Sequence, residues 1–344
     1  MRHFFYHTLL GICAVTLLSS CEHDEPVNPI KTREDRTLLV LTSDGKVYDQ
    51  TGQVVEVLPD CTYASEIISE GDDYFVAGVS SKGRVGYWKN GKWHTLHVDF
   101  IEDVDHWMYG IDKWDSYIYL LDMPNVLKNS GIFPLKDSQL FIPADHALRV
   151  SGGKCYVIGY ELTDVETVFH PVIYTNYKSY FKKEYLPLPP GYTTGECWSI
   201  YASNGNHTVI GGIVGREPAV WVDKQCQIYQ VSSPELLEDG VYPVGRIVAI
   251  TESNGHIYAA GFEYNSDIEL MATVWTDGVP AHYRYNADYD GSSQAFGIYR
   301  YGNDVYVLTT EYDPEMEDLM THIWLNEEIL VSYRGIQAVG LTIL

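Results

Sequence analysis

Hydrophobic and polar residues alternate over short segments along most of the chain, and the segments are separated by Gly, Asn or Asp. Alternation with a period of two is typical of half-buried β-strands, and Asn-Gly or Asp-Gly pairs favour tight hairpin turns. Residues 247–261 show the pattern, with an apolar strand, the turn Ser-Asn-Gly-His and a second strand of aromatic and small residues. We therefore expect an all-β protein built from short hairpins.

The hairpin recurs along the chain. The clearest copies begin at Cys197, Ile247 and Ala295, and looser copies begin at Ala64, Met108 and Ala147. Each copy is followed by an aromatic third strand, and successive aromatic residues lie 41 to 54 residues apart: Trp88, Phe133, Tyr174, Trp221, Trp275 and Trp324. A repeat of this length is typical of a β-propeller blade, whereas a β-sandwich with chance similarities is the alternative.

The two ends of the chain supply complementary parts of one further repeat. Residues 336–344 predict a first strand without a second, and residues 36–59 predict strands two, three and four without a first. Pairing the two parts would close the ring and leave no exposed sheet edge between them. The sequence therefore predicts a seven-bladed β-propeller over residues 37–344, with one composite blade.

The N-terminus has the features of an export signal. Arg2 precedes an apolar run over residues 8–18, which is too short to span a bilayer, and small residues precede Cys21. These residues resemble the bacterial lipobox, which implies removal of residues 1–20 and lipidation of Cys21; an ordinary secretory signal is the alternative. Residues 21–36 are polar and hold two prolines, so they predict a linker.

Two further features point to a type of lipoprotein. Acidic Glu22, Asp24 and Glu25 follow Cys21, and the blades carry segments such as "IYAAG" at Ile257 and "ATVWTDG" at Ala272. Over residues 37–344 the chain resembles the β-propeller-repeat lipoproteins of Bacteroidetes-type bacteria. The resemblance implies an outer-membrane lipoprotein exposed at the cell surface, and it supplies no catalytic residues.

Charge and cysteine content exclude several classes of partner. The chain has 47 Asp and Glu against 23 Lys and Arg, a net charge of -24, so nucleic acid is not an expected partner. No C-x-x-C pair occurs, and we expect neither a metal nor a cofactor. Four cysteines follow Cys21, and their redox state stays open between a Cys197–Cys226 disulfide and free thiols: Cys61, Cys155, Cys197 and Cys226.

The two faces of the predicted disc differ. Turns between strands one and two, and between three and four, are short, and we call this side the tight-turn face. Connections between strands two and three, and between blades, are long and acidic, and they form the long-loop face. Because the N-terminal segment enters as a second strand, the linker should leave from the tight-turn face. Membrane attachment through Cys21 would then point the long-loop face outward.

The long-loop face is the predicted binding surface, because long loops on a rigid scaffold commonly carry binding residues. Aromatic rings stack on the C–H faces of sugars and carboxylates accept hydrogen bonds from hydroxyls, so we predict a non-catalytic glycan-binding module. The alternatives are a polysaccharide-active enzyme and a protein-interaction scaffold, and for the aromatic residues a packing role in the loops. The candidate ligand-binding residues are Trp107, Tyr192, Tyr242, Tyr289, Asp288 and Asp290.

Recognised catalytic motifs are missing from the sequence. It contains no G-x-S-x-G, no H-E-x-x-H and no phosphate-binding glycine loop. The Trp-x-Asp triplets at Trp221 and Trp275 only imitate the WD dipeptide, and we expect their indoles to pack between blades. His207 and His256 follow tight turns, and we expect them to be either solvated or structurally bonded.

Overall fold

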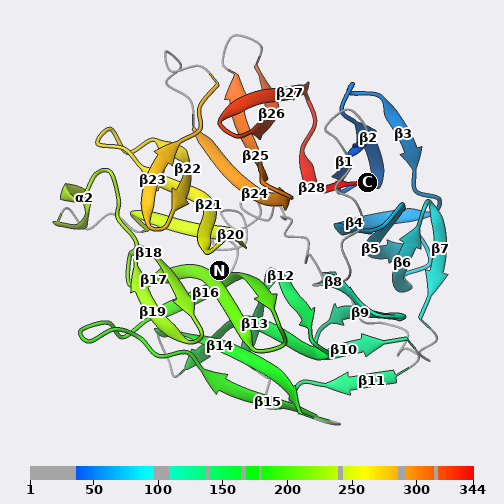
Figure 1. The fold of residues 1–344 in the computed structure, drawn as a ribbon, viewed down its shortest axis with the longest axis horizontal. Helices are drawn as coiled ribbons and strands as arrows, with labels where there is room; N and C mark the ends of the chain where they lie inside the picture. Colours follow the sequence, from blue (N-terminus) through cyan, green and yellow to red (C-terminus); the bar gives the residue numbers. More distant parts are fainter. Residues whose placement is uncertain are drawn as a thin grey trace, which may run out of the picture.

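The computed structural model describes residues 36–96, 108–129, 131–136, 140–163, 168–177, 180–238, 243–285, 292–313 and 317–344. In these residues, seven four-stranded antiparallel sheets surround a common centre (Figure 1). The chain is therefore a seven-bladed β-propeller, as predicted. One strand of each sheet lies next to the centre, and the other three follow outward.

The four strands of each blade succeed one another from the centre outward. In that order, blade 1 contains β4 (Cys61–Glu70), β5 (Asp73–Ser80), β6 (Val85–Lys89) and β7 (Lys92–Thr95). Blade 2 contains β8 (Met108–Trp114), β9 (Tyr117–Asp122), β10 (Asn125–Lys128) and β11 (Gly131–Pro134). Blade 3 contains β12 (Phe141–Ser151), β13 (Lys154–Thr163), β14 (Val168–Tyr177) and β15 (Tyr180–Tyr185). Blade 4 contains β16 (Gly195–Ser203), β17 (His207–Val214), β18 (Glu217–Val222) and β19 (Gln225–Ile228).

Blade 5 contains β20 (Gly245–Ser253), β21 (His256–Tyr264), β22 (Leu270–Thr276) and β23 (Val279–His282). Blade 6 contains β24 (Ser293–Tyr301), β25 (Asp304–Asp313), β26 (Asp318–Leu325) and β27 (Glu328–Arg334). Blade 7 contains β28 (Ala338–Ile343), β1 (Leu38–Thr42), β2 (Lys46–Asp49) and β3 (Val54–Val57). The short helix α2 (Glu235–Glu238) precedes blade 5. Among the described residues, no helix has the length and apolar content needed to cross a bilayer.

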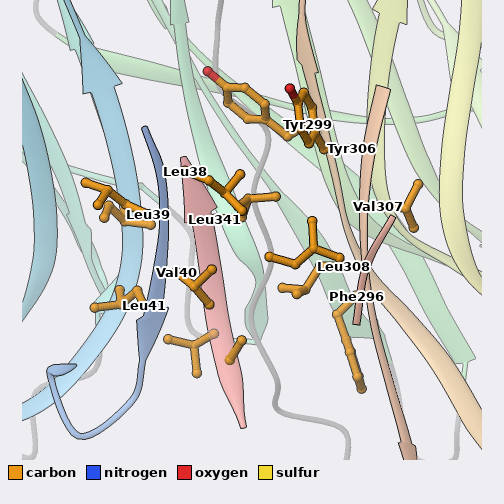
Figure 2. Close-up of a cluster of buried hydrophobic side chains, with 14 of the residues drawn as sticks. Leu38, Leu39, Val40, Leu41, Phe296, Tyr299, Tyr306, Val307, Leu308 and Leu341 are labelled. Carbon is orange, nitrogen blue, oxygen red and sulfur yellow. The ribbon is translucent and has the colours of Figure 1, made fainter. Parts of the chain in front are cut away.

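Blade 7 is the predicted composite of the two chain ends. β28 pairs with β1 in antiparallel register, with Leu341 opposite Val40. The backbone N–H groups of Thr37 and Leu344 each donate to the other residue's carbonyl, at 3.1 and 2.9 Å. Figure 2 shows Leu38 and Leu341 side by side and close to Leu308 of blade 6, and all three belong to one buried apolar cluster. The closing blade is thus joined to its neighbour by a continuous core.

The chain enters the propeller from the tight-turn face, as predicted. The Arg36 guanidinium lies 2.5 Å from Asp304 and stacks on the ring of Tyr301 at 4.5 Å. Tyr301 and Asp304 flank the short turn between β24 and β25, whereas Ser293 begins β24 at the opposite face. Arg36, the first described residue, therefore lies on the side away from the long loops.

Aromatic residues of the third strands tie neighbouring blades together. Trp88, Trp221 and Trp275 are fully buried, as expected from the packing between blades that was predicted for Trp221 and Trp275. At four junctions the third strand donates a side-chain hydrogen bond to a carbonyl in the connection that leaves the preceding blade: Trp88 to Pro59 (3.1 Å), Tyr174 to Lys136 (3.2 Å), Trp221 to Pro187 (2.8 Å) and Trp275 to Gln230 (2.8 Å). We call these bonds the aromatic straps.

One third-strand assignment was wrong. Phe133 lies in the outer strand β11, not in the third strand of blade 2. The third strand is β10, where buried Leu127 faces Leu120 as Trp221 faces Ile210 in blade 4. Because β10 has no aromatic residue, the spacing pattern selected the next aromatic residue along the chain.

The Trp-x-Asp triplets end in turn-capping residues. Asp223 and Asp277 adopt φ values of 47° and 50°, and their carboxylates accept hydrogen bonds from the backbone N–H groups of Thr208 and Ile257, both at 2.9 Å. Each aspartate therefore fixes the first residues of the second strand against the turn between strands three and four. The Trp-x-Asp triplets thus end in a turn cap, and they only imitate the WD dipeptide, as predicted.

Both histidines that follow tight turns contact these caps. His207 Nδ1 lies 3.0 Å from Asp223, and His256 Nδ1 lies 2.6 Å from Asp277. His207 Nε2 also lies 2.5 Å from Glu252 of blade 5, so this imidazole connects two blades. Burial opposes its protonation, but hydrogen bonds to Asp223 and Glu252 and their charges outweigh burial and raise the pKa of His207.

Replacement of Trp221 by Phe should weaken the junction between blades 3 and 4. The ring is kept but the hydrogen bond to the Pro187 carbonyl is lost, so we expect a loss of about 0.5–1.5 kcal/mol in the free energy of unfolding, measured by urea denaturation. Trp324→Phe is the matched control, since that indole donates to the rotatable Thr309 hydroxyl of its own blade. Equal losses in the two variants would contradict a strap between blades.

The His207 contacts should make stability depend on pH. Because the folded state raises this pKa, the contribution is complete below the ordinary histidine value of about 6.5 and is lost as the pH rises through the folded-state value. With solvent screening, His207→Gln should cost about 0.5 kcal/mol near pH 5.5 and almost nothing near pH 9, in urea denaturation. A cost that is the same at both pH values would exclude this role.

Candidate functional site

Each inner strand carries a β-bulge, and bulges commonly redirect side chains near functional sites. In five blades one residue is bulged out of register, and in blade 1 two residues are: Tyr109, Trp198, Val248, Phe296 and Val339, and in blade 1 Thr62 and Ser65. In β12 the interruption is larger, because residues 144–147 all lie opposite the single residue Ile158. Blade 3 therefore presents an extra backbone segment beside the centre of the ring.

Half-buried side chains gather at the long-loop ends of five inner strands. They are Tyr63, Tyr109, Asp145, Trp198 and Arg246, and we call them the inner rim. Most of their neighbours along the same strands are buried. The five strands, β4, β8, β12, β16 and β20, follow one another around the centre in Figure 1. The inner rim thus combines three aromatic rings, one carboxyl group and one guanidinium group at one end of the ring.

A buried cluster of charged residues holds the wide bulge of β12. His146 has φ 56° and is only 3% exposed, and its Nδ1 lies 2.9 Å from Glu66 Oε1. Arg149 Nη1 lies 3.1 Å from the same oxygen. Glu66 Oε2 accepts a 2.8 Å hydrogen bond from the backbone N–H of Ile111. One carboxylate of blade 1 therefore fixes the inner strands of blades 2 and 3.

The pKa values of two carboxyl groups in this cluster shift in opposite directions. Burial opposes ionisation of Glu66, but the charges of His146 and Arg149 outweigh burial and lower its pKa. Burial raises the pKa of Asp145, and the Glu66 charge adds to the rise against the effect of His146. Burial also raises the pKa of Tyr63 to about 12, with contributions from Asp145 and Tyr109. The phenol of Tyr63 therefore keeps its proton and can donate as well as accept a hydrogen bond, and Asp145 is ionised less readily than an exposed aspartate.

On the opposite side of the rim, a guanidinium group packs on aromatic rings. Arg246 stacks on Trp198 with 4.5 Å between its Cζ and the ring centroid, and it lies 5.9 Å from the Phe262 centroid. The Trp198 indole donates a 3.0 Å hydrogen bond to Glu196 Oε2. These contacts fix the orientation of both Trp198 and Arg246 at the junction of blades 4 and 5.

Of the predicted ligand-binding residues, the structure describes only Tyr192. Its hydroxyl donates a 2.5 Å hydrogen bond to Glu217, which together with burial raises the pKa of Tyr192 to about 12. Its ring covers Gly215, where a Cβ atom would lie 2.8 Å from the ring. Tyr192 is thus held against blade 4. The remaining predicted residues lie outside the described residues: Trp107, Tyr242, Tyr289, Asp288 and Asp290.

A Ser-His-Glu cluster on blade 5 does not have the geometry of a nucleophilic triad. Ser232 Oγ and His282 Nε2 both contact Glu263 Oε1, at 2.6 and 2.5 Å, and lie 3.4 Å from each other. In a triad the serine and the carboxylate contact opposite ring nitrogens. The buried Glu263 carboxylate instead anchors the connection that enters blade 5.

Metal and thiol chemistry find no support in the described part of the chain. No group of three or more His, Cys, Asp or Glu residues there is arranged to hold a metal ion. The four described cysteines are free thiols, which answers the question of pairing left open by the sequence. Burial raises the pKa of Cys61 to about 11 and of Cys226 to about 12, so these thiols are poor nucleophiles.

Comparisons with known proteins agree with the fold. No protein-family model matches the chain, and no curated protein matches it. A puromycin-hydrolyzing peptidase of Mycobacterium tuberculosis is similar at a TM-score of 0.52 and 8% identity, over 91% of this chain and 55% of the peptidase. The fungal lectin of Aleuria aurantia, a six-bladed β-propeller, gives a TM-score of 0.41 at 9% identity, over 79% and 95% of the chains. AofleA of Arthrobotrys oligospora, in an arginine-to-alanine mutant, gives 0.42 at 12% identity, over 96% and 98%.

Removal of Arg149 should destabilise the wide bulge. In Arg149→Met the buried Glu66 carboxylate loses a charged partner, so we expect a loss of about 3–5 kcal/mol in the free energy of unfolding, by urea denaturation at neutral pH. Adding Glu66→Gln should recover part of the loss, because the uncompensated buried charge is then absent. A single variant as stable as the native chain would contradict a structural role for the pair.

Proposed function

We propose that the protein is an outer-membrane lipoprotein, anchored through Cys21, that binds a glycan at its long-loop face without cleaving it. The observation that carries the proposal is the inner rim, where aromatic and polar side chains retain solvent access in strands that are otherwise buried. Propeller interiors normally place apolar side chains there, as Val339 and Leu341 do in blade 7. The rim is therefore a polar and aromatic surface on a rigid base.

The chemistry of the rim suits a sugar ring. Tyr63, Tyr109 and Trp198 offer flat faces for the apolar C–H side of a pyranose. Asp145 offers a carboxyl group that can accept from one hydroxyl and, when protonated, donate to another. Rigid aromatic side chains lose little conformational entropy on binding, which favours them as contact residues.

The position of Arg36 supports the proposed orientation. Arg36 lies at the tight-turn face, and the 15 residues 22–36 extend at most about 50 Å. Attachment of Cys21 to a membrane would therefore place the tight turns toward the lipid and the inner rim away from it. The net charge of -24 would hold the disc off an anionic surface.

A polysaccharide-active enzyme is the second candidate, and the raised pKa of Asp145 favours it. Glycosidases use a carboxyl group of raised pKa as a general acid, together with a second carboxylate. The neighbouring Glu66 carboxylate is only 1% exposed and engaged by Ile111 and Arg149. Because Glu66 is occupied in this way, the rim is better suited to binding than to hydrolysis.

Glycan binding can be tested with soluble residues 22–344 on a glycan array, followed by product analysis of each bound glycan. Tyr109→Ala and Trp198→Ala should each weaken binding about tenfold or more, since each removes a stacking face. Tyr180→Ala, which removes an exposed tyrosine of outer strand β15, should bind as the native chain does.

Three results would change the proposal. Product formation that is abolished in Asp145→Asn would establish the enzyme. Binding that persists in both rim variants would move the site away from the inner rim. Failure to bind any glycan would contradict glycan binding and favour the protein-interaction scaffold.

A further inference from the structure

Arg246 is the inner-rim residue with a buried N–H donor that has no acceptor among the described residues. Within the part of the chain that the structure describes, its guanidinium makes no hydrogen bond, and its Nε is buried without an acceptor. A guanidinium carries five N–H donors in a fixed plane, and burial without acceptors costs free energy. Stacking on Trp198 and Phe262 satisfies the face of the group but none of its donors.

Glu196 does not supply the missing acceptor. Its Oε2 lies 3.8 Å from Arg246 Nη2, beyond hydrogen-bonding distance, and this oxygen already accepts from the Trp198 indole. The other arginine of the inner strands beside the rim shows the contrast, because Arg149 contacts both Glu66 and the Leu148 carbonyl. Arg246 is thus held in place by its rings and by the charge of Glu196, while its buried Nε has no acceptor among the described residues.

We propose that the inner rim binds a sugar that carries a carboxylate, and that this carboxylate pairs with the Arg246 guanidinium. The inference rests on the proposed glycan-binding function and names the class of sugar. A carboxylate is planar and matches the N–H fork of a guanidinium in a two-point contact. The side-chain exposure of 13% leaves room for contact at one edge of the group only.

The surroundings of Arg246 allow no more than a single negative charge on the ligand, because the Glu196 carboxylate already lies 3.8 Å from the guanidinium. Burial raises the pKa of Asp145, so its carboxyl group holds its proton to higher pH than an exposed aspartate and repels an anion less. The protein's net charge of -24 disfavours a polyanion, but this field is screened over about 10 Å at ordinary ionic strength. We therefore expect isolated acidic sugars in a mostly neutral glycan.

The test uses pairs of oligosaccharides that end in glucuronic acid, each matched to the same oligosaccharide with that carboxylate reduced to the alcohol. Affinities for residues 22–344 are measured by calorimetry with the native protein, Arg246→Gln and Arg246→Lys. The native protein should bind the acid form about 10- to 100-fold more tightly than the reduced form. Arg246→Gln should bind both forms equally, and Arg246→Lys should keep part of the preference.

The matched control is Arg84→Gln, which removes an equal charge from an exposed position between β5 and β6 on the long-loop face and should keep the full preference. Equal binding of both forms by the native protein would overturn the inference and leave glycan binding intact. A preference that survives in Arg246→Gln would overturn the assignment to Arg246. Binding of neither form would contradict the proposed function, and the inference would fall with it.

Discussion

The antiparallel pairing of β28 with β1 is the constraint on which the rest of the molecule depends. Each blade is a separate sheet, and the seventh exists only because the two chain ends share it. The hydrogen bonds between β28 and β1 therefore close the ring. Because the N-terminal segment enters this blade as its second strand, Arg36 lies on one side and the inner rim on the other.

Neighbouring blades are joined by different kinds of side chain at different junctions. Four junctions have an aromatic strap, but the third strand of blade 2 contributes Leu127, which has no donor. At this junction Glu66 reaches from blade 1 to the backbone of Ile111. The buried Glu66 carboxylate at this junction is paired with Arg149 and His146. These residues also form the surroundings of Asp145. The carboxylate that joins blades 1 to 3 therefore also determines the environment of the inner-rim residue Asp145.

The fold could be predicted from the sequence because turn residues and third-strand tryptophans repeat in the chain itself. Phe133 was misplaced because blade 2 has no aromatic residue at the repeating position. The inner rim could not be predicted, since a bulge depends on the register of two strands and leaves no mark in either one. Because of the wide bulge in β12, the repeat was predicted to start only at Ala147. Asp145 and His146 were therefore assigned to no strand. Most of the predicted loop residues remain predictions.

The place of β1 in the composite blade also has a mechanical consequence. The linker continues directly into a strand that is hydrogen-bonded on one side to β28 and on the other to β2. A pull applied to the N-terminal end of β1 would act along the strand, so both ladders would be loaded in shear and their hydrogen bonds would share the force. A terminal strand at the outer edge of a blade would have only one such ladder to resist the same pull. The N-terminal end of the propeller is thereby held by two rows of hydrogen bonds.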